Sequence, residues 1–170
     1  MTLTYTPDDV LPLGDPRLHE KCAPVERSEL AEAIEQGMAL CALILAFREK
    51  YGMGRAVAAP QVGYMKRVIC MNIDRPLIFI NPVLHDLSEE MMELWDDCMC
   101  FPDVLVRLRR HRHCKMTFLD TNWVEHTWSF SDDLSELIQH EYDHLEGILA
   151  TQRAIDERSF ALRRYVKAQS

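Results

Sequence analysis

Glycine and basic residues are scarce in this 170-residue sequence, and each shortage excludes a class of protein. The six glycines and eight prolines form no repeat and no Pro/Gly/Ser-rich stretch, which excludes a collagen-like or low-complexity chain. Lysine and arginine number 19 against 27 aspartates and glutamates, so the net charge is −8. We therefore expect no binding to nucleic acid or anionic membranes through bulk positive charge, and no sequence-specific nucleic-acid partner.

Long hydrophobic runs are also missing. The longest apolar run, 38–47, has ten residues, whereas a membrane-spanning helix needs about 20. The N-terminus carries no basic segment followed by an apolar one, as a secretory signal would. We expect a cytoplasmic protein without a membrane partner. In that compartment the six cysteines are expected to be free thiols or metal ligands rather than disulfides.

The composition, 48% hydrophobic and 27% charged, is that of a globular protein, and the absence of a linker predicts one domain over residues 1–170. Periodicity predicts a helix from Ser28 to about Lys50, ended by Gly52. The stripe expected to face the core consists of Leu30, Ile34, Met38, Cys41 and Leu45.

Segments rich in β-branched and aromatic residues predict antiparallel strands between residues 67 and 130. These segments are 67–71, 77–80, 105–119 and 123–130. A second helix is expected from Ser131 to about Gly147, and a short third helix from Ser159 to Lys167. The order of elements predicts an α+β fold with antiparallel strands packed around a central helix.

The second helix contains the pattern H-E-x-x-H. His140 and His144 lie one turn apart on the same face, which lets two imidazoles bind one divalent ion. Glu141 lies beside them and can accept a proton from a water at the metal. The alternative, two histidines on an ordinary polar helix face, is disfavoured by the spacing and by the helix itself.

A catalytic metal needs a third protein ligand. Cys98 and Cys100 are the candidates, in a segment that ends in Phe-Pro and can form a tight turn. The residues alone do not choose between these two thiols, and either cysteine alone would by default be a small buried residue.

Three segments together resemble the peptide deformylase family. Residues 54–63, GRAVAAPQVG, resemble the family's G-Φ-G-Φ-A-A-P-Q motif. Residues 96–100, DDCMC, resemble E-G-C-L-S, and residues 139–145, QHEYDHL, resemble Q-H-E-x-D-H-L. The stretch 10–25 is also similar, so the resemblance covers nearly the whole chain.

The resemblance implies a site and a reaction. It implies that the metal ligands are Cys98, His140 and His144, and that Glu141 is the general acid–base. The Gln61 side chain and the Met99 backbone N–H would bind the oxyanion. The implied reaction is hydrolysis of the formyl group of N-formylmethionyl peptides, nascent chains included, and the implied fold is that of a deformylase around a metal-binding helix. The cofactor is one divalent ion, with Fe²⁺ expected and Zn²⁺ or Ni²⁺ as alternatives.

Several positions depart from the family's pattern near its substrate channel. Arg55 stands at an aliphatic position, and Ala56 and Asp97 stand at glycine positions. Asp96 replaces glutamate, and Cys100 replaces serine. These departures, with Gly54, mark the segments expected to line the substrate site.

Glu136 lies one turn before His140, on the same helix face. The resemblance places Glu136 and Arg55 at the pocket for the methionine side chain, where the family has apolar residues. Either the two charges form a polar wall of the pocket, or both side chains bend outward to water. A polar wall would favour a polar first side chain over methionine.

Two alternative functions therefore stand beside deformylation of N-formylmethionyl peptides. The first is hydrolysis of a different, more polar N-formyl or acyl amide, and the second is metal binding without turnover.

A basic cluster at 107–113 is expected to be a solvated strand face, with Arg107 and Arg109 on one side. Its functional interpretation is contact with a nascent peptide or with the ribosome.

Overall fold

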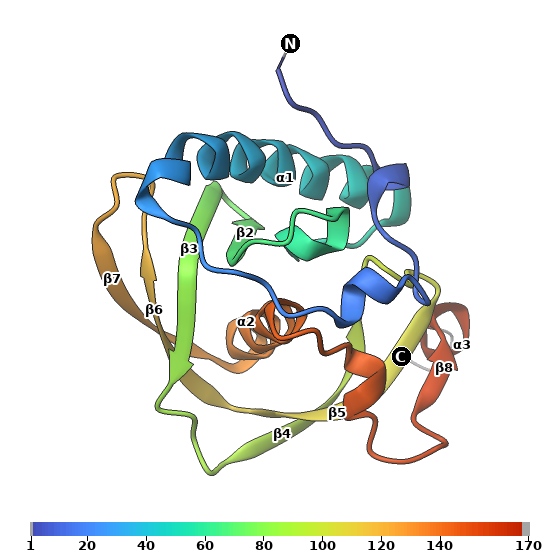
Figure 1. Cartoon of the computed structure of the whole chain (residues 1–170). Helices are drawn as coiled ribbons and strands as arrows, with labels where there is room; N and C mark the ends of the chain where they lie inside the picture. Colours follow the sequence, from blue (N-terminus) through green and yellow to red (C-terminus); the bar gives the residue numbers. More distant parts are fainter. Residues whose placement is uncertain (1, 168–170) are drawn as a thin grey trace.

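Two antiparallel sheets surround the helix α2 (Asp132–Leu145), and the helix α1 (Leu30–Tyr51) covers the far face of the larger sheet (Figure 1). The structure is a computed structural model, and it describes residues 2–167. The strands are β1 (Ala56–Ala58), β2 (Val68–Asn72), β3 (Pro76–His85), β4 (Met91–Asp97), β5 (Val104–His111), β6 (His113–Leu119), β7 (Glu125–Ser131) and β8 (Phe160–Leu162). The last helix is α3 (Arg163–Lys167), and short 3₁₀ turns occupy Pro7–Asp9, Pro16–His19, Arg27–Glu29, Ala59–Val62 and Ala150–Arg153.

The larger sheet has the strand order β1-β2-β3-β6-β7, and the smaller has β4-β5-β8. All of their pairings are antiparallel. The α+β expectation, with antiparallel strands around a central helix, is confirmed. The expected strand at 105–119 is in fact two, because β5 ends at His111 and β6 of the other sheet begins at His113.

Alternation along β2 separates the two main cores. Val68 and Cys70 face α1 and pack with Phe47, whereas Ile69 and Met71 face α2 and pack with residues such as Ile138. All five β2 side chains are buried. The larger sheet is therefore a platform with one helix on each face, which fixes the position of α2 relative to β1.

The expected helix at the N-terminal side is α1, and Gly52 ends it with a left-handed φ of 68°. The expected core stripe is wrong in part, because Met38 and Leu45 are 53% and 48% exposed. Smaller residues face the sheet instead: a Cβ at Gly37 would lie 2.7 Å from Ile78 Cδ1. Because α1 lies so close to β3, the helix face that carries Gly37 is the one that packs against the sheet.

Within the described residues one helical stretch, Arg27–Tyr51, has the length and hydropathy to cross a membrane. Its buried residues, Phe47 among them, belong to the core against the larger sheet. A core helix of this composition passes the same test, so the expectation of no membrane partner stays a prediction.

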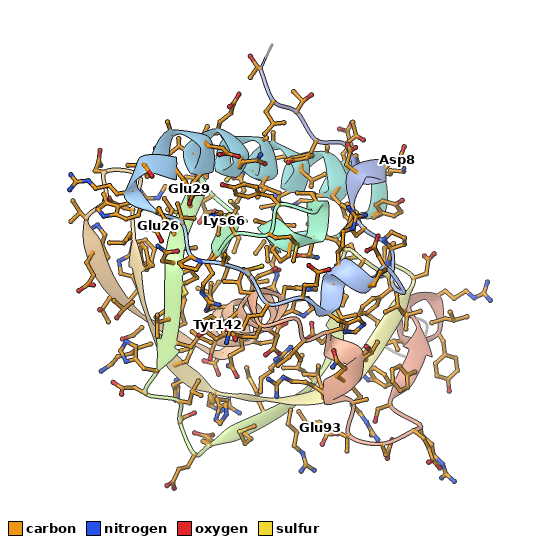
Figure 2. All side chains as sticks on the ribbon, viewed as in Figure 1. Asp8, Glu26, Glu29, Lys66, Glu93 and Tyr142 are labelled. Carbon is orange, nitrogen blue, oxygen red and sulfur yellow. The ribbon has the colours of Figure 1, made fainter. Side chains whose placement is uncertain are left out.

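One further expectation needs correction, and one strand was not expected. The third helix begins at Arg163 rather than Ser159, because Phe160–Leu162 pair with β5 as strand β8. Strand β4 follows from no hydrophobic pattern, since both faces of its sequence MMELWDD mix apolar and acidic residues. Ion pairs also link segments that are far apart in the sequence. Lys66 Nζ, for example, lies 2.8 Å from a carboxylate oxygen of Glu29 (Figure 2).

Candidate metal centre and active site

Three potential ligand atoms converge between α2 and the end of β4. The Nε2 atoms of His140 and His144 are 3.2 Å apart, and Cys98 Sγ is 3.4 Å from His144 Nε2. The ligand atoms of all three residues lie within 4.8 Å of one another, and all three side chains are buried. Two nitrogens bound at about 2.1 Å to one tetrahedral ion would be about 3.4 Å apart. The arrangement therefore fits one ion that accepts nitrogen and sulfur ligands.

The structure distinguishes the two cysteines of the ligand loop, which we define as residues 97–103. Cys98 belongs to the group with the imidazoles, whereas Cys100 does not, among the described residues. Gln61 Nε2 lies 3.7 Å from Cys98 Sγ and 3.5 Å from Cys100 Sγ, so both thiols border the same amide. The geometry thus supports the choice of Cys98 that the family resemblance implied.

His140 is oriented by a carboxylate. Its Nδ1 lies 2.9 Å from Asp96 Oδ2, which turns Nε2 toward His144 and Cys98. Burial raises the pKa of Asp96, but the charges of His140 and Arg110 outweigh burial and hold that pKa below its usual range. Asp96 therefore keeps its charge and its role as an acceptor, although it has a shorter side chain than the glutamate of the family motif.

Behind Asp96 lies a buried chain of charges that sequence reasoning missed. Arg110, with a side chain that is 3% exposed, donates to Asp96 at 3.0 Å and also to Asp143. Arg153 donates to both oxygens of Asp143, each at 2.7 Å. The sequence offered one signal, since strand alternation puts Arg110 on the face opposite to Arg107 and Arg109.

The basic cluster is therefore split between two environments. Arg107 and Arg109 are partly exposed and pair loosely with Glu93, at 3.7 and 3.6 Å. The expectation of a solvated face is confirmed for these two residues and is wrong for Arg110, which is inside.

Glu141 points into the site without a partner. Its side chain is buried, and its Oε2 has no hydrogen-bond partner among the described residues. Burial raises the pKa of Glu141 to about 7, even though the neighbouring His140 charge lowers it. A carboxylate with this pKa can both accept and return a proton near neutral pH.

Gln61 and Met99 both lie next to Cys98. Gln61 Oε1 accepts from the Ala58 N–H at 2.8 Å, which directs Nε2 toward the two thiols. Met99 follows Cys98 in the ligand loop and is buried against the α1 core. Gln61 is itself buried in the turn that follows β1, so its amide donor has a fixed direction.

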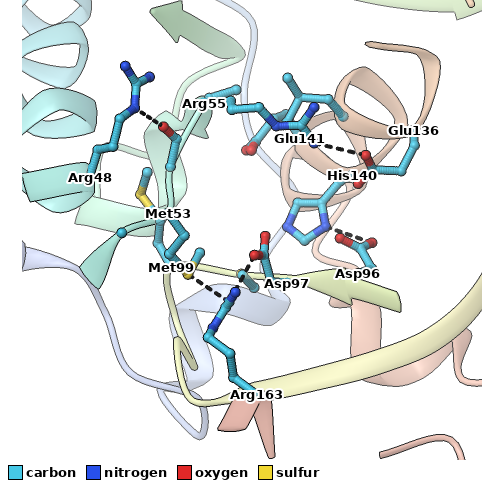
Figure 3. A pocket seen from close by; sticks show the side chains of 15 residues that line it. Arg48, Met53, Arg55, Asp96, Asp97, Met99, Glu136, His140, Glu141 and Arg163 are labelled. Carbon is cyan, nitrogen blue, oxygen red and sulfur yellow. Dashed lines mark hydrogen bonds and ion pairs between the residues drawn. The ribbon is translucent and has the colours of Figure 1, made fainter. Parts of the chain in front are cut away.

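A cavity of about 320 Å³ opens onto Cys98, His140 and Glu141 (Figure 3). The residues expected to line the substrate site all border it: Gly54, Arg55, Ala56, Asp97 and Glu136. Gly54 has a φ of 124°, and a Cβ there would lie 3.0 Å from Met99 Cε. The positive φ therefore favours glycine at this wall of the cavity, and a larger residue would also require the end of the Met99 side chain to shift.

Arg55 and Glu136 face the cavity as an ion pair. Arg55 Nη2 lies 3.1 Å from Glu136 Oε2, and Arg55 Nη1 lies 3.3 Å from Asp133 Oδ2. The Glu136 side chain is only 9% exposed, and Arg55, which is 38% exposed, pairs with it, so the two side chains do not both bend outward to water. Burial, together with the neighbouring charge of Asp96, raises the pKa of Glu136 to about 7, although the charges of His140 and Arg55 lower it.

Sequence reasoning also missed Arg48, Met53 and Arg163 as cavity residues. Arg48 donates to the Gly54 carbonyl at 2.9 Å and holds the glycine segment in place (Figure 3). Arg163 comes from α3 and bonds to Asp97 at 2.8 Å. No local pattern signals either contact.

The comparisons with known proteins agree with this geometry. The family model described as polypeptide deformylase matches residues 7–159. A peptide deformylase of Treponema pallidum is 38% identical over 158 residues, covering 90% of this chain and 92% of that protein. That of Pseudothermotoga lettingae is 33% identical over 153 residues, with 89% and 85% covered.

A solved structure gives the same result for the fold. The class I type b peptide deformylase from Acinetobacter baumannii superimposes with a TM-score of 0.79 at 29% identity, covering 89% of this chain and 100% of that one. Because the family model and these relatives span nearly the whole chain, the chain belongs to the peptide deformylase family.

Proposed function

We propose that Cys98, His140 and His144 hold the single metal ion with which this chain works. As a peptide deformylase the chain is a metallohydrolase that removes the formyl group from nascent peptides. The observation that supports the ligand set is the group of three buried ligand atoms within 4.8 Å of one another. The two alternatives, a more polar amide substrate and binding without turnover, are not favoured by the comparisons.

The donor set bears on the identity of the metal. A thiolate and two imidazoles suit zinc, iron and nickel, and we propose Fe²⁺ as the native ion. When bound, the ion supplies Lewis acidity, which polarises a carbonyl and lowers the pKa of a water. One thiolate leaves the site with a net positive charge, so this acidity is retained.

Glu141 is proposed to move the proton of the reaction. Its unpartnered Oε2 accepts a proton from the attacking water and passes that proton to the departing amine nitrogen. The pKa of about 7 suits both halves of this transfer. The products are formate and a peptide with a free amino terminus.

Gln61 and the Met99 N–H are proposed to bind the carbonyl oxygen as it becomes negative. Support comes from the fixed direction of Gln61 Nε2, which is set by the Ala58 N–H. Losing one such donor typically lowers the rate about 10²–10³-fold.

The cavity beside this group is proposed to take the formylated residue. A related deformylase from Acinetobacter baumannii, 26% identical with a TM-score of 0.76, has been solved with Met-Ala-Ser bound. Gly54, Ala56 and Asp97 would border the peptide, and Arg55 with Glu136 would meet its first side chain.

Partners and location are also proposals. We propose a single domain over residues 1–170 that works in the cytoplasm, where formylated nascent chains are made. Ribosome contact is proposed on the side of Arg107 and Arg109, whose guanidinium groups pair loosely with Glu93 and, for Arg107, with Asp156. Co-sedimentation with ribosomes at low and at moderate salt would test this contact.

The ligand set is tested by metal content. Each of three single variants should lose stoichiometric metal, because a site with three protein ligands no longer holds the ion once one ligand is removed. The variants are Cys98→Ala, His140→Ala and His144→Ala. The matched control is Cys100→Ser, two residues from Cys98, which should retain the metal. Metal retained by Cys98→Ser and lost by Cys100→Ser would contradict the assignment.

A further inference from the structure

The segment that leads to Arg163 returns to the active site. The family model matches residues 7–159, and the described residues after 159 form β8 and α3. Strand β8 pairs with β5 through Phe160 opposite Val106 and Leu162 opposite Val104. This pairing places Arg163, the first residue of α3, among the residues that line the cavity (Figure 3).

Arg163 bonds to both ends of the ligand loop, residues 97–103. Its Nη2 lies 2.8 Å from Asp97 Oδ2, at the start of the loop. At the other end, Nε donates to the Pro102 carbonyl at 2.8 Å, and the backbone N–H donates to the Asp103 carbonyl at 2.8 Å. Nη2 also lies 2.9 Å from Met53 Sδ, across the cavity wall (Figure 3).

The chemistry of these contacts requires arginine. A guanidinium presents several donors in a rigid plane, so one side chain can bind a carboxylate, a carbonyl and a thioether at once. A lysine ammonium on a flexible stem cannot hold the same three groups in one geometry. The Arg163 side chain is 18% exposed, which leaves the Asp97 contact partly shielded from water.

The loop that Arg163 clamps carries Cys98 directly after Asp97. A shift of Asp97 is passed to Cys98 through one peptide unit, and Cys98 Sγ must stay close to His144 Nε2. Partners that orient a ligand from behind typically contribute about 10–100-fold in metal affinity or activity.

We propose that Arg163 is a positioning residue for the metal centre, so that the C-terminal segment 160–167 is a working part of the active site. It acts through Asp97 and the ligand loop and holds Cys98 in register with the two histidines. This role rests on the proposed ligand set, in which Cys98 binds the metal.

The test measures metal release and needs no activity. Arg163→Met in the full chain, loaded with Zn²⁺, should give up its metal to a colorimetric chelator about tenfold faster than the unmodified chain. The matched control is Arg164→Met, which removes the same charge from the next residue, an exposed one on the same helix. Equal release rates for the two variants would overturn the proposal.

A double-mutant cycle tests whether Arg163 acts through the loop. Asp97→Ala alone should also speed release, and the double variant should lose little more than either single variant. If the release rate of the double variant rises by the product of the two single-variant factors, positioning through Asp97 is contradicted. If Arg163→Met does not fold, faster release from Asp97→Ala supports the clamp, and an unchanged rate overturns it.

The readouts separate this proposal from the ligand assignment. Retention of Zn²⁺ by Cys98→Ala would overturn the ligand set itself. Loss of Zn²⁺ by Cys98→Ala, together with equal release from Arg163→Met and Arg164→Met, would overturn only the role of Arg163. Arg163→Lys should release Zn²⁺ faster than the unmodified chain, because a lysine cannot make all three contacts.

Discussion

Arg110 is the residue whose replacement most directly tests how the metal centre is supported. Its buried guanidinium lies between Asp96, which orients His140, and Asp143, which Arg153 also binds. Arg110→Met keeps an unbranched side chain of similar length and removes the charge. The buried carboxylates of Asp96 and Asp143 then lose the guanidinium that they share.

The magnitude follows from the burial of these groups. The side chains of Arg110 and Asp96 are 3% and 2% exposed, and removing one partner of a buried pair costs about 3–5 kcal/mol. Each carboxylate keeps one cationic neighbour, Asp96 with His140 and Asp143 with Arg153. We therefore expect the lower end, about 3 kcal/mol, which corresponds to a fall in Tm of roughly 6–12 °C at this chain length.

The assay is thermal and urea unfolding of the metal-free protein, so that metal affinity does not enter. The matched control is Arg109→Met, the neighbouring strand residue, whose side chain is 62% exposed. One step along the strand reverses the face, so the control should change the free energy of unfolding by less than about 0.5 kcal/mol. Equal effects of the two variants would refute the argument that Arg110 is a buried support.

Three other predictions concern the chemistry of the site. Glu141→Gln should keep its metal and its fold but lose about 10²–10⁴-fold in hydrolysis, because an amide cannot accept the proton; near-normal kcat in the metal-loaded variant would remove the assignment. Air should inactivate the Fe²⁺ form with oxidation at Cys98 or Cys100, since a thiolate ligand beside Fe²⁺ and the thiol next to it are the groups most easily oxidised; mass spectrometry that finds both reduced after full inactivation would indicate metal loss instead. Arg55→Ile with Glu136→Ile should shift kcat/KM toward N-formylmethionyl over N-formylglutaminyl peptides, by about fivefold for each kcal/mol; an unchanged ratio would mean that the pair does not contact the first side chain.

Much of the metal centre was predictable because its signal is local. His140 and His144 lie four residues apart on one helix, so a single turn of backbone geometry brings them together. The choice of Cys98 over Cys100 was not a local matter, since it depends on how the ligand loop meets α2. The family resemblance supplied that choice, and the structure agrees with it.

The support of the centre was not predictable in this way. Arg163 and Asp97 are separated by 66 positions, and no periodicity links them. Strand β4 was missed for a different reason: it pairs on one side only, with β5, and both of its faces mix apolar and acidic residues, so no hydrophobic alternation marks it. The face of α1 was misjudged because the helix is apolar on most sides, so close packing at Gly37 decided the orientation.

The most direct test of the account is formate release from an N-formylmethionyl peptide by the Fe²⁺-loaded protein, prepared without oxygen. The account predicts that formate and new peptide amino termini appear in equal amounts, and that both disappear in Cys98→Ala, which should hold no metal. No formate above the metal-free control, from folded protein with one metal per chain, would contradict it.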